Sequence, residues 1–304
     1  MIAMADDITM RVVRSDGAQM VFDGASSGWG IEQGDSSEWA TLDQTVKTSP
    51  NIIRDGVARV SKRLDDKDRT VTAYYFGSEP EAKVRARAIS FFNPKYEFRV
   101  YKTYLGVTRW YEGDLLAFAI EDNAASIMPT IKFTILSMDV YYRDADRNER
   151  PFGSSTPRLG FPFVSHLASD KRRPRDHPAG FVVSELVYSG LNTVWNTGDV
   201  PCWYRVEIRA KGEIVNPKID KDGKFVQLNT VLVEGDVAII DFESSPPKVT
   251  VNGVNAIALA SRDSKFTGMQ MQVGKNKFRF DCDNQDSRAL AEVRVLFHRL
   301  YLGV

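Results

Sequence analysis

Cysteine and histidine are scarce in this chain of 304 residues, and its formal net charge is zero. The two cysteines, Cys202 and Cys282, are too few for a disulfide framework, so we expect buried thiols made in a reducing cytosol. Of the three histidines, His166 and His177 have no Cys or Glu at metal-ligand spacing, which argues against a metal site. The 40 Lys and Arg residues balance the 40 Asp and Glu residues, so the basic excess of dedicated nucleic-acid-binding proteins is missing.

Long apolar runs are missing as well. The longest compact one, 115–120, is far shorter than the roughly 18 residues of a transmembrane helix. Residues 1–7 lack the basic and apolar regions of a secretory signal peptide. The sequence therefore predicts a protein that is made in the cytosol and has no membrane partner.

Motifs that carry catalytic chemistry are weak. Residues 24–28 match G-x-S-x-G, but the glycine-rich stretch after them cannot form the helix that a nucleophile elbow needs. Residues 268–276 resemble a phosphate loop, but the glycines are too far apart, and Asn276 replaces the Ser or Thr that would bind magnesium. Glu112 and Asp114 could form a carboxylate pair, yet nothing near them supplies the context of a glycosidase site. We therefore expect no catalytic residue, no cofactor and no metal, and hence no enzyme.

Alternation of apolar and polar residues is abundant and predicts a mainly β protein. Asn252-Gly253 lies between two such segments and predicts a hairpin, because this pair favours the positive φ of a tight turn. The strands predicted on this pattern are 56–64, 69–77, 96–105, 130–142, 181–188, 203–210, 224–231, 236–241, 277–281 and 292–298.

One segment, 79–92, has the spacing of a helix. Residues 78–81, Ser-Glu-Pro-Glu, match a capping box with proline in the first turn. Val84, Ala88 and Phe91 then fall on one apolar stripe. The sequence therefore predicts a single α-helix in the first half of the chain.

Prolines and crowded charges interrupt the alternation between two patterned regions. Residues 146–180 contain five prolines and few alternating apolar residues. The sequence therefore predicts two domains, 1–145 and 181–304, joined by a linker at 146–180. The basic cluster 171–175 could contact phosphate, although its acidic flanks favour a solvated linker.

Three aromatic residues, Trp195, Trp203 and Tyr204, could form a platform on which a sugar stacks. Trp203 falls on the same face of its strand as Arg205 and Glu207, which favours exposure. Packing in a core or an interface is the more common use of large aromatics, so the pattern leaves both alternatives open.

An ordered series of short elements fills the C-terminal third. It starts at Asn196-Thr-Gly-Asp-Val-Pro201 and ends at the terminal tyrosine. The residues that mark it, here called the signature residues, are Asp241, Asn252, Gly253, Asn255, Gly274, Asn276 and Tyr301. In this order they resemble the distal tail protein (Dit) family of siphophages, most strongly over 196–304. The strand 131–143 and the helix 78–92 extend the resemblance to the first half, where the match is looser.

Each signature element also has a plain physical role. Asp241 can cap the end of its strand. Asn252-Gly253 supplies positive φ for a hairpin, and we expect Gly274 and Asn276 to do the same for the next one. Tyr301 should bury its ring while its hydroxyl reaches a backbone partner.

The resemblance to the Dit family implies two β-sandwich-like domains with different tasks. The N-terminal domain would form a homo-oligomeric ring, a hexamer, and the C-terminal domain would be galectin-like. The ring would join the tail tube to the tail-tip or baseplate proteins of the virion, and genome DNA would only pass through it. The alternative is a carbohydrate-binding module of the tail tip that acts in host recognition.

The N-terminal domain is the better candidate for ring contacts. Apolar residues fall on both faces of the strand 96–105 and of 107–111, more than one core requires. Tyr104, Trp110 and Tyr111 are therefore our candidate interface residues.

Overall fold

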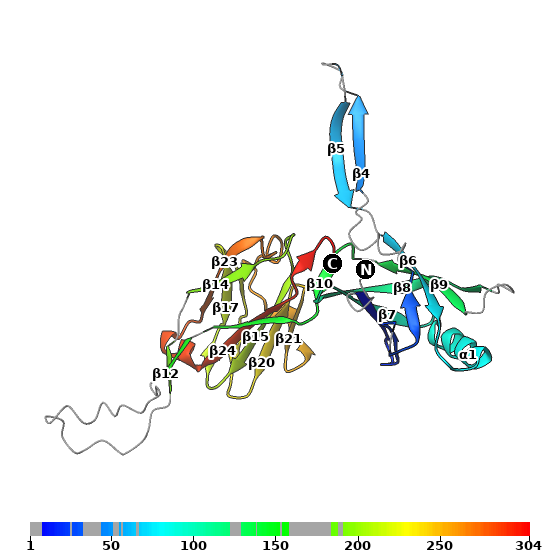
Figure 1. Cartoon of the computed structure of the whole chain (residues 1–304). Helices are drawn as coiled ribbons and strands as arrows, with labels where there is room; N and C mark the ends of the chain where they lie inside the picture. Colours follow the sequence, from blue (N-terminus) through cyan, green and yellow to red (C-terminus); the bar gives the residue numbers. More distant parts are fainter. Residues whose placement is uncertain are drawn as a thin grey trace, which may run out of the picture. The chain divides into compact units, whose positions relative to one another are not determined.

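The computed structural model describes residues 8–24, 26–32, 44–50, 55, 57–64, 67–121, 129–137, 139–152, 154–157, 184–187 and 191–304. These residues are mostly β-strand and contain one α-helix, which confirms the mainly β prediction (Figure 1). The chain divides into two compact units. The N-terminal unit is Met1–Arg147, Gly198–Val200 and Arg299–Val304, and the C-terminal unit is Asn148–Thr197 and Pro201–His298.

A nine-stranded antiparallel sheet forms the body of the N-terminal unit. Its main path is β2-β1-β7-β8-β9-β6-β3, and β10 pairs with both β8 and β25. The two end strands contact each other, so the sheet rolls into a barrel-like form. The strands are β1 (Ile8–Arg14), β2 (Gln19–Phe22), β3 (Trp29–Ile31), β6 (Lys67–Tyr75), β7 (Glu97–Tyr104), β8 (Val107–Glu121), β9 (Thr130–Ser137), β10 (Tyr142–Asp144) and β25 (Leu300–Tyr301).

Aromatic side chains fill the inside of this sheet. Phe98 and Phe133 are at most 1% exposed, and the Phe92 ring stacks 4.5 Å from the Phe133 ring. At Gly113 the neighbouring strand comes so close that a side chain would strike the Leu136 carbonyl. Only glycine permits that approach.

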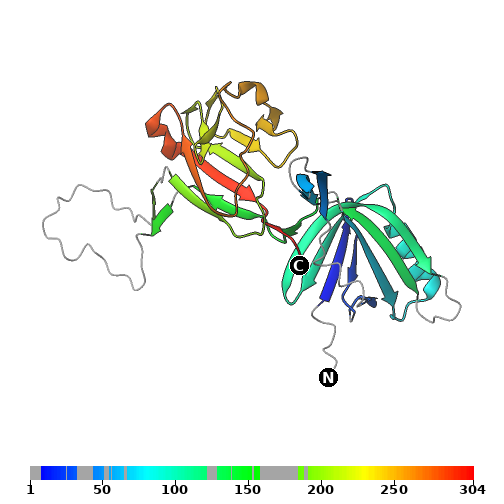
Figure 2. The same cartoon turned by 90° about the horizontal axis from the view of Figure 1, so that it is seen from above.

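The predicted helix is present as α1 (Glu81–Phe91), which lies along one side of the sheet (Figure 2). Its stripe of Val84, Ala88 and Phe91 is buried, as the spacing predicts. The predicted capping box is not formed, because Pro80 occupies the N-cap position and no side chain bonds there. Among the described residues, no helix is long and apolar enough to cross a membrane.

A separate two-stranded sheet, β4 (Gln44–Pro50) with β5 (Val57–Leu64), also belongs to the N-terminal unit. Its strands pair with each other over their whole length, with one irregularity in register after Lys47. We call this hairpin the arm.

Two larger sheets face each other in the C-terminal unit. Tyr204 on one and Phe278 on the other meet edge to face, with ring centres 5.1 Å apart. The six-stranded sheet has the order β11-β24-β15-β20-β21-β22 and the four-stranded sheet the order β14-β23-β17-β18. The first contains β11 (Asn148–Pro151), β15 (Tyr204–Ala210), β20 (Val237–Asp241), β21 (Lys248–Val251), β22 (Val254–Asn255) and β24 (Ala291–Phe297). The second contains β14 (Leu191–Asn196), β17 (Lys218–Lys221), β18 (Lys224–Gln227) and β23 (Gly274–Asp281).

Short elements complete the C-terminal unit. They are the pairs β12 (Ser154–Pro157) with β13 (Ser184–Val187) and β16 (Ile214–Val215) with β19 (Val231–Leu232), and the 3-10 helices η4 (Ile257–Leu259) and η5 (Gln285–Leu290).

The unit boundaries differ from the predicted domains at three places, one of which is Gly198–Val200, assigned from sequence to the second domain but part of the N-terminal unit. Asn148–Pro151, at the start of the predicted linker, is strand β11 and pairs with β24. Arg299–Val304, assigned from sequence to the second domain, belongs to the N-terminal unit because β25 pairs with β10. The remaining linker residues, 158–180, with His166, His177 and the basic cluster 171–175, lie outside the described residues.

Candidate functional site: interface surfaces and signature residues

The arm buries almost nothing within its own chain. Every side chain from 44 to 50 and from 57 to 63 is exposed. Val57 and Val60 are 66% and 67% exposed, and Val46 is 44% exposed. A two-stranded hairpin without a packed face is marginally stable in water. The arm therefore has the properties of an element that is completed by a partner.

The arm also differs in charge from the unit that carries it. Residues 44–64 contain five basic side chains and one acidic side chain, Asp55. The rest of 1–147 contains 14 basic and 21 acidic side chains. The arm is therefore positive and the remainder of its unit negative.

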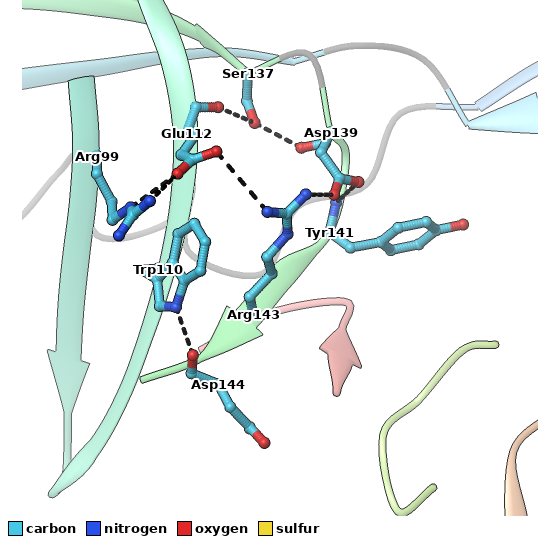
Figure 3. Close-up of polar contacts among 8 residues, drawn as sticks. All are labelled: Arg99, Trp110, Glu112, Ser137, Asp139, Tyr141, Arg143 and Asp144. Carbon is cyan, nitrogen blue, oxygen red and sulfur yellow. Dashed lines mark hydrogen bonds and ion pairs between the residues drawn. The ribbon is translucent and has the colours of Figure 1, made fainter. Parts of the chain in front are cut away.

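A second candidate surface surrounds Trp110 on β8 (Figure 3). The guanidinium groups of Arg99 and Arg143 lie 4.4 and 5.0 Å from the indole ring, each in a cation–π contact. The indole nitrogen donates to the backbone carbonyl of Asp144. Trp110 is consequently only 4% exposed.

Carboxylates complete this cluster. Glu112 pairs with Arg99 and lies 3.8 Å from a guanidinium nitrogen of Arg143. Arg143 also donates to Asp139 at 2.9 Å. Because Glu112 is bound to arginine, it is poorly placed to act as the carboxylate pair with Asp114 that the sequence suggested.

The structure corrects part of the interface expectation. Of the three candidate residues, Tyr104 is 41% exposed, whereas Trp110 and Tyr111 are 4% and 1% exposed. Tyr111 faces the interior, where the Arg69 guanidinium lies 4.5 Å from its ring. The exposed apolar side chains of this region sit at the β7–β8 turn, where Leu105 joins Tyr104.

Asp241 caps the end of β20, as its position in the sequence predicts. Its carboxylate accepts hydrogen bonds from the backbone N–H of Glu243 at 2.9 Å and from Arg205 at 2.8 Å. Burial acts to raise the pKa of Asp241, but the Arg205 guanidinium and the Glu243 N–H outweigh it and hold that pKa below its usual value. Asp241 thereby fixes the loop that follows it.

Asn252 and Gly253 form the predicted hairpin turn between β21 and β22, with φ of 51° and 79°. Nothing lies within 4 Å of a Cβ built on Gly253, so the turn needs glycine for its φ alone. The Asn252 amide also bridges to Asp236 and to the Val237 N–H. Asn255 accepts from the N–H of Ile257.

Gly274 has the expected positive φ of 92°, but Asn276 does not share its role. Asn276 is a fully buried member of β23. Its side-chain amide exchanges hydrogen bonds with the N–H and carbonyl of Gln272, both at 2.8 Å. Asn276 thus closes the turn through its side chain.

Tyr301 lies on β25 and pairs with Tyr142 across the strands. The Arg109 guanidinium lies 3.6 Å from its ring. Burial raises the pKa of the Tyr301 hydroxyl, and Asp144 contributes through its charge and a side-chain hydrogen bond. The Asp144 side chain therefore lies close to the Tyr301 hydroxyl.

The structure removes Tyr204 from the possible sugar platform. Trp195 and Trp203 are 58% and 36% exposed, but Tyr204 is completely buried. Cys202 and Cys282 are both buried, as predicted, and are not joined to each other by a disulfide. In the described part of the chain, no cluster of three His, Cys, Asp or Glu side chains could hold a metal ion.

Comparisons with known proteins agree with the resemblance that the ordered signature residues indicated. Residues 197–297 match the family described as siphovirus-type tail component, C-terminal domain. The structure of SPP1 Dit (gp 19.1), described as a paradigm of the hub adsorption apparatus in phages infecting Gram-positive bacteria, is similar with a TM-score of 0.61. It is 12% identical, and the match covers 96% of this chain and 98% of that one. The chain has a Dit-type fold.

A chain of the phage P2 baseplate, in its activated conformation with calcium, is also similar. Its TM-score is 0.53 at 10% identity, and the match covers 96% of this chain and 98% of that one. No curated protein matches the sequence. The resemblance to distal tail proteins inferred from the signature residues is confirmed, and the chain is Dit-like over both of its units.

Proposed function

We propose that this Dit-like protein is a structural component of a siphophage tail tip that assembles into a closed ring through its N-terminal unit. Six copies, as the family resemblance implies, would join the tail tube to the tail-tip or baseplate proteins. Genome DNA would pass through the ring without being bound. No chemical step is involved, and the protein would reside in the virion after synthesis in the host cytoplasm.

The exposed arm is the observation that carries this proposal. Its valines and its marginal stability call for a partner surface. Its positive charge complements the negative remainder of the N-terminal unit on a second copy. A contact between two different patches of identical chains is heterologous, and such contacts generate rings when the rotation closes.

The test compares the full-length protein with two variants by light scattering and negative-stain microscopy. In one, a short Gly-Ser linker replaces residues 44–64. In the other, Val57→Asp and Val60→Asp place carboxylates on the arm. We expect rings from the parent protein and monomers from both variants, with unchanged melting temperatures. Rings of the parent should also dissociate more readily at high salt, because exposed charge contacts are screened.

Val254→Asp is the matched control, because Val254 is equally exposed, at 70%, but lies at the β21–β22 turn of the other unit. It should leave assembly unchanged. Rings that persist without the arm would refute the role of the arm, and a parent protein that stays monomeric at high concentration would refute the ring.

A further inference from the structure

An aromatic pocket of about 310 Å³ lies within the C-terminal unit, beside the loop that Asp241 fixes. Trp203, Phe242 and Phe266 contribute its aromatic side chains. Glu243 is the charged residue of its lining, and Ser and Thr residues with one proline supply the rest. The ring assembly proposed above makes no use of this pocket.

Hydrogen bonds to backbone groups fix each wall of the pocket. Next to Trp203, Cys202 exchanges two hydrogen bonds with Met271, at 3.0 and 2.9 Å. The loop with Glu243 is held by the Asp241 carboxylate. Beside Phe266, the N–H of Lys265 donates to the Phe225 carbonyl at 2.9 Å. A site built in this way needs little ordering when a ligand enters.

The electrostatic character of the pocket favours a cation. Aromatic faces carry partial negative charge, and Glu243 is an acidic residue of the lining. Among the described residues that line the pocket there is no Lys or Arg. Arg205 lies on the adjoining strand, and its guanidinium is bound to Asp241.

The size and apolar walls of the pocket narrow the class of cation. A primary ammonium is compact and strongly hydrated, so it loses much hydration on entering an aromatic site. A quaternary ammonium is bulky and apolar on its surface, and aromatic residues are its usual protein partners. We propose that this pocket binds a quaternary ammonium group, such as that of choline.

Calorimetric titration of the full-length protein with choline chloride tests the proposal, with 3,3-dimethyl-1-butanol as the neutral ligand of the same shape. We expect choline to bind with a dissociation constant of about 1 mM or lower. The neutral ligand should bind at least about fivefold more weakly, because it lacks the cation–π attraction. Glu243→Gln and Trp203→Leu should each weaken choline binding by about fivefold or more.

Phe266→Leu provides a second aromatic variant in case Trp203→Leu lowers the melting temperature. Trp195→Leu is the matched control, since Trp195 is an exposed tryptophan of the same unit outside the pocket. The proposal would be overturned if the neutral ligand bound as tightly as choline. It would also be overturned if no binding were seen at a choline concentration of about ten times the expected dissociation constant. Two further probes are Nα-acetyl-lysine methylamide, which carries a primary ammonium group, and glucose, a neutral sugar. Tighter binding of either one than of choline would also overturn the proposal. None of these results bears on ring formation, which is measured by light scattering.

Discussion

The guanidinium of Arg99 lies 4.4 Å from the centre of the Trp110 ring, while the indole nitrogen of Trp110 donates to the Asp144 carbonyl. Trp110 stands on the outer face of β8, the face that alternation assigns to solvent. Arginine side chains and the short strand β10 cover it there. The tryptophan therefore stabilises the N-terminal unit itself.

Replacing Trp110 should lower stability before it affects assembly. Trp110→Ala is expected to cost about 3–5 kcal/mol, as for other large buried aromatics. Differential scanning calorimetry should show an earlier transition for the N-terminal unit and an unchanged one for the other. Trp195→Ala, at a 58% exposed site, should change stability by less than about 0.5 kcal/mol. If the Trp110→Ala protein has normal stability but fails to form rings, Trp110 belongs to the ring interface instead.

Asp241 should make the C-terminal unit sensitive to acid. Its pKa is lower in the folded state than in the unfolded state. The carboxylate therefore stabilises the fold fully at pH values above the ordinary pKa of aspartate. This stabilisation is lost as pH falls through the folded-state pKa. Asp241→Asn should therefore destabilise the unit by about 1–3 kcal/mol at pH 7, the cost of losing charged hydrogen bonds.

The difference between the parent and Asp241→Asn should narrow below about pH 4, where aspartates protonate. Urea unfolding at several pH values measures it. Asp263→Asn, which alters an exposed aspartate of the same unit, serves as the control. A gap that stays constant down to pH 2 would mean that the charge of Asp241 contributes nothing.

Limited trypsin digestion should cut first within 158–180, where the basic cluster 171–175 offers sites among the prolines. The two fragments should remain together in gel filtration, because Leu300 and Tyr301 pair with β10 of the other fragment. Arg109 reinforces this by contacting the Tyr301 ring and the Gly303 carbonyl.

A variant that ends at His298 still holds its fragments through the pairs β11–β24 and β12–β13 after the same cut, so they should separate at a lower urea concentration than the fragments of the parent. Fragments of the parent that separate without this truncation would argue against the β10–β25 pairing. A first cut within 200–300 would count against the predicted boundary between the domains.

Neutral sugars should bind the full-length protein no more tightly than about 1 mM. Trp195 and Trp203 are exposed, but a sugar site needs several convergent donors and acceptors beside its aromatic residue. Calorimetry or a glycan array provides the measurement. Micromolar affinity for a saccharide would favour the carbohydrate-binding alternative.

Local sequence determined most of the secondary structure. The apolar stripe of α1 and the strand alternation of β15 and β24 follow from spacing alone. The turn at Asn252-Gly253 follows from the φ that its two residues tolerate. Each of these signals lies within a few residues along the chain, so it can be recognised before the fold is known.

Contacts between distant segments decided what the sequence left open. Alternation separates two faces of a strand, but it cannot say which face a remote element will cover. Trp110 is buried because β10 lies beside β8, and Tyr301 joins the N-terminal unit because the last strand returns to β10. The arm, by contrast, is exposed although the sequence predicts one of its strands at 56–64, since no segment of its own chain covers either of its faces among the described residues.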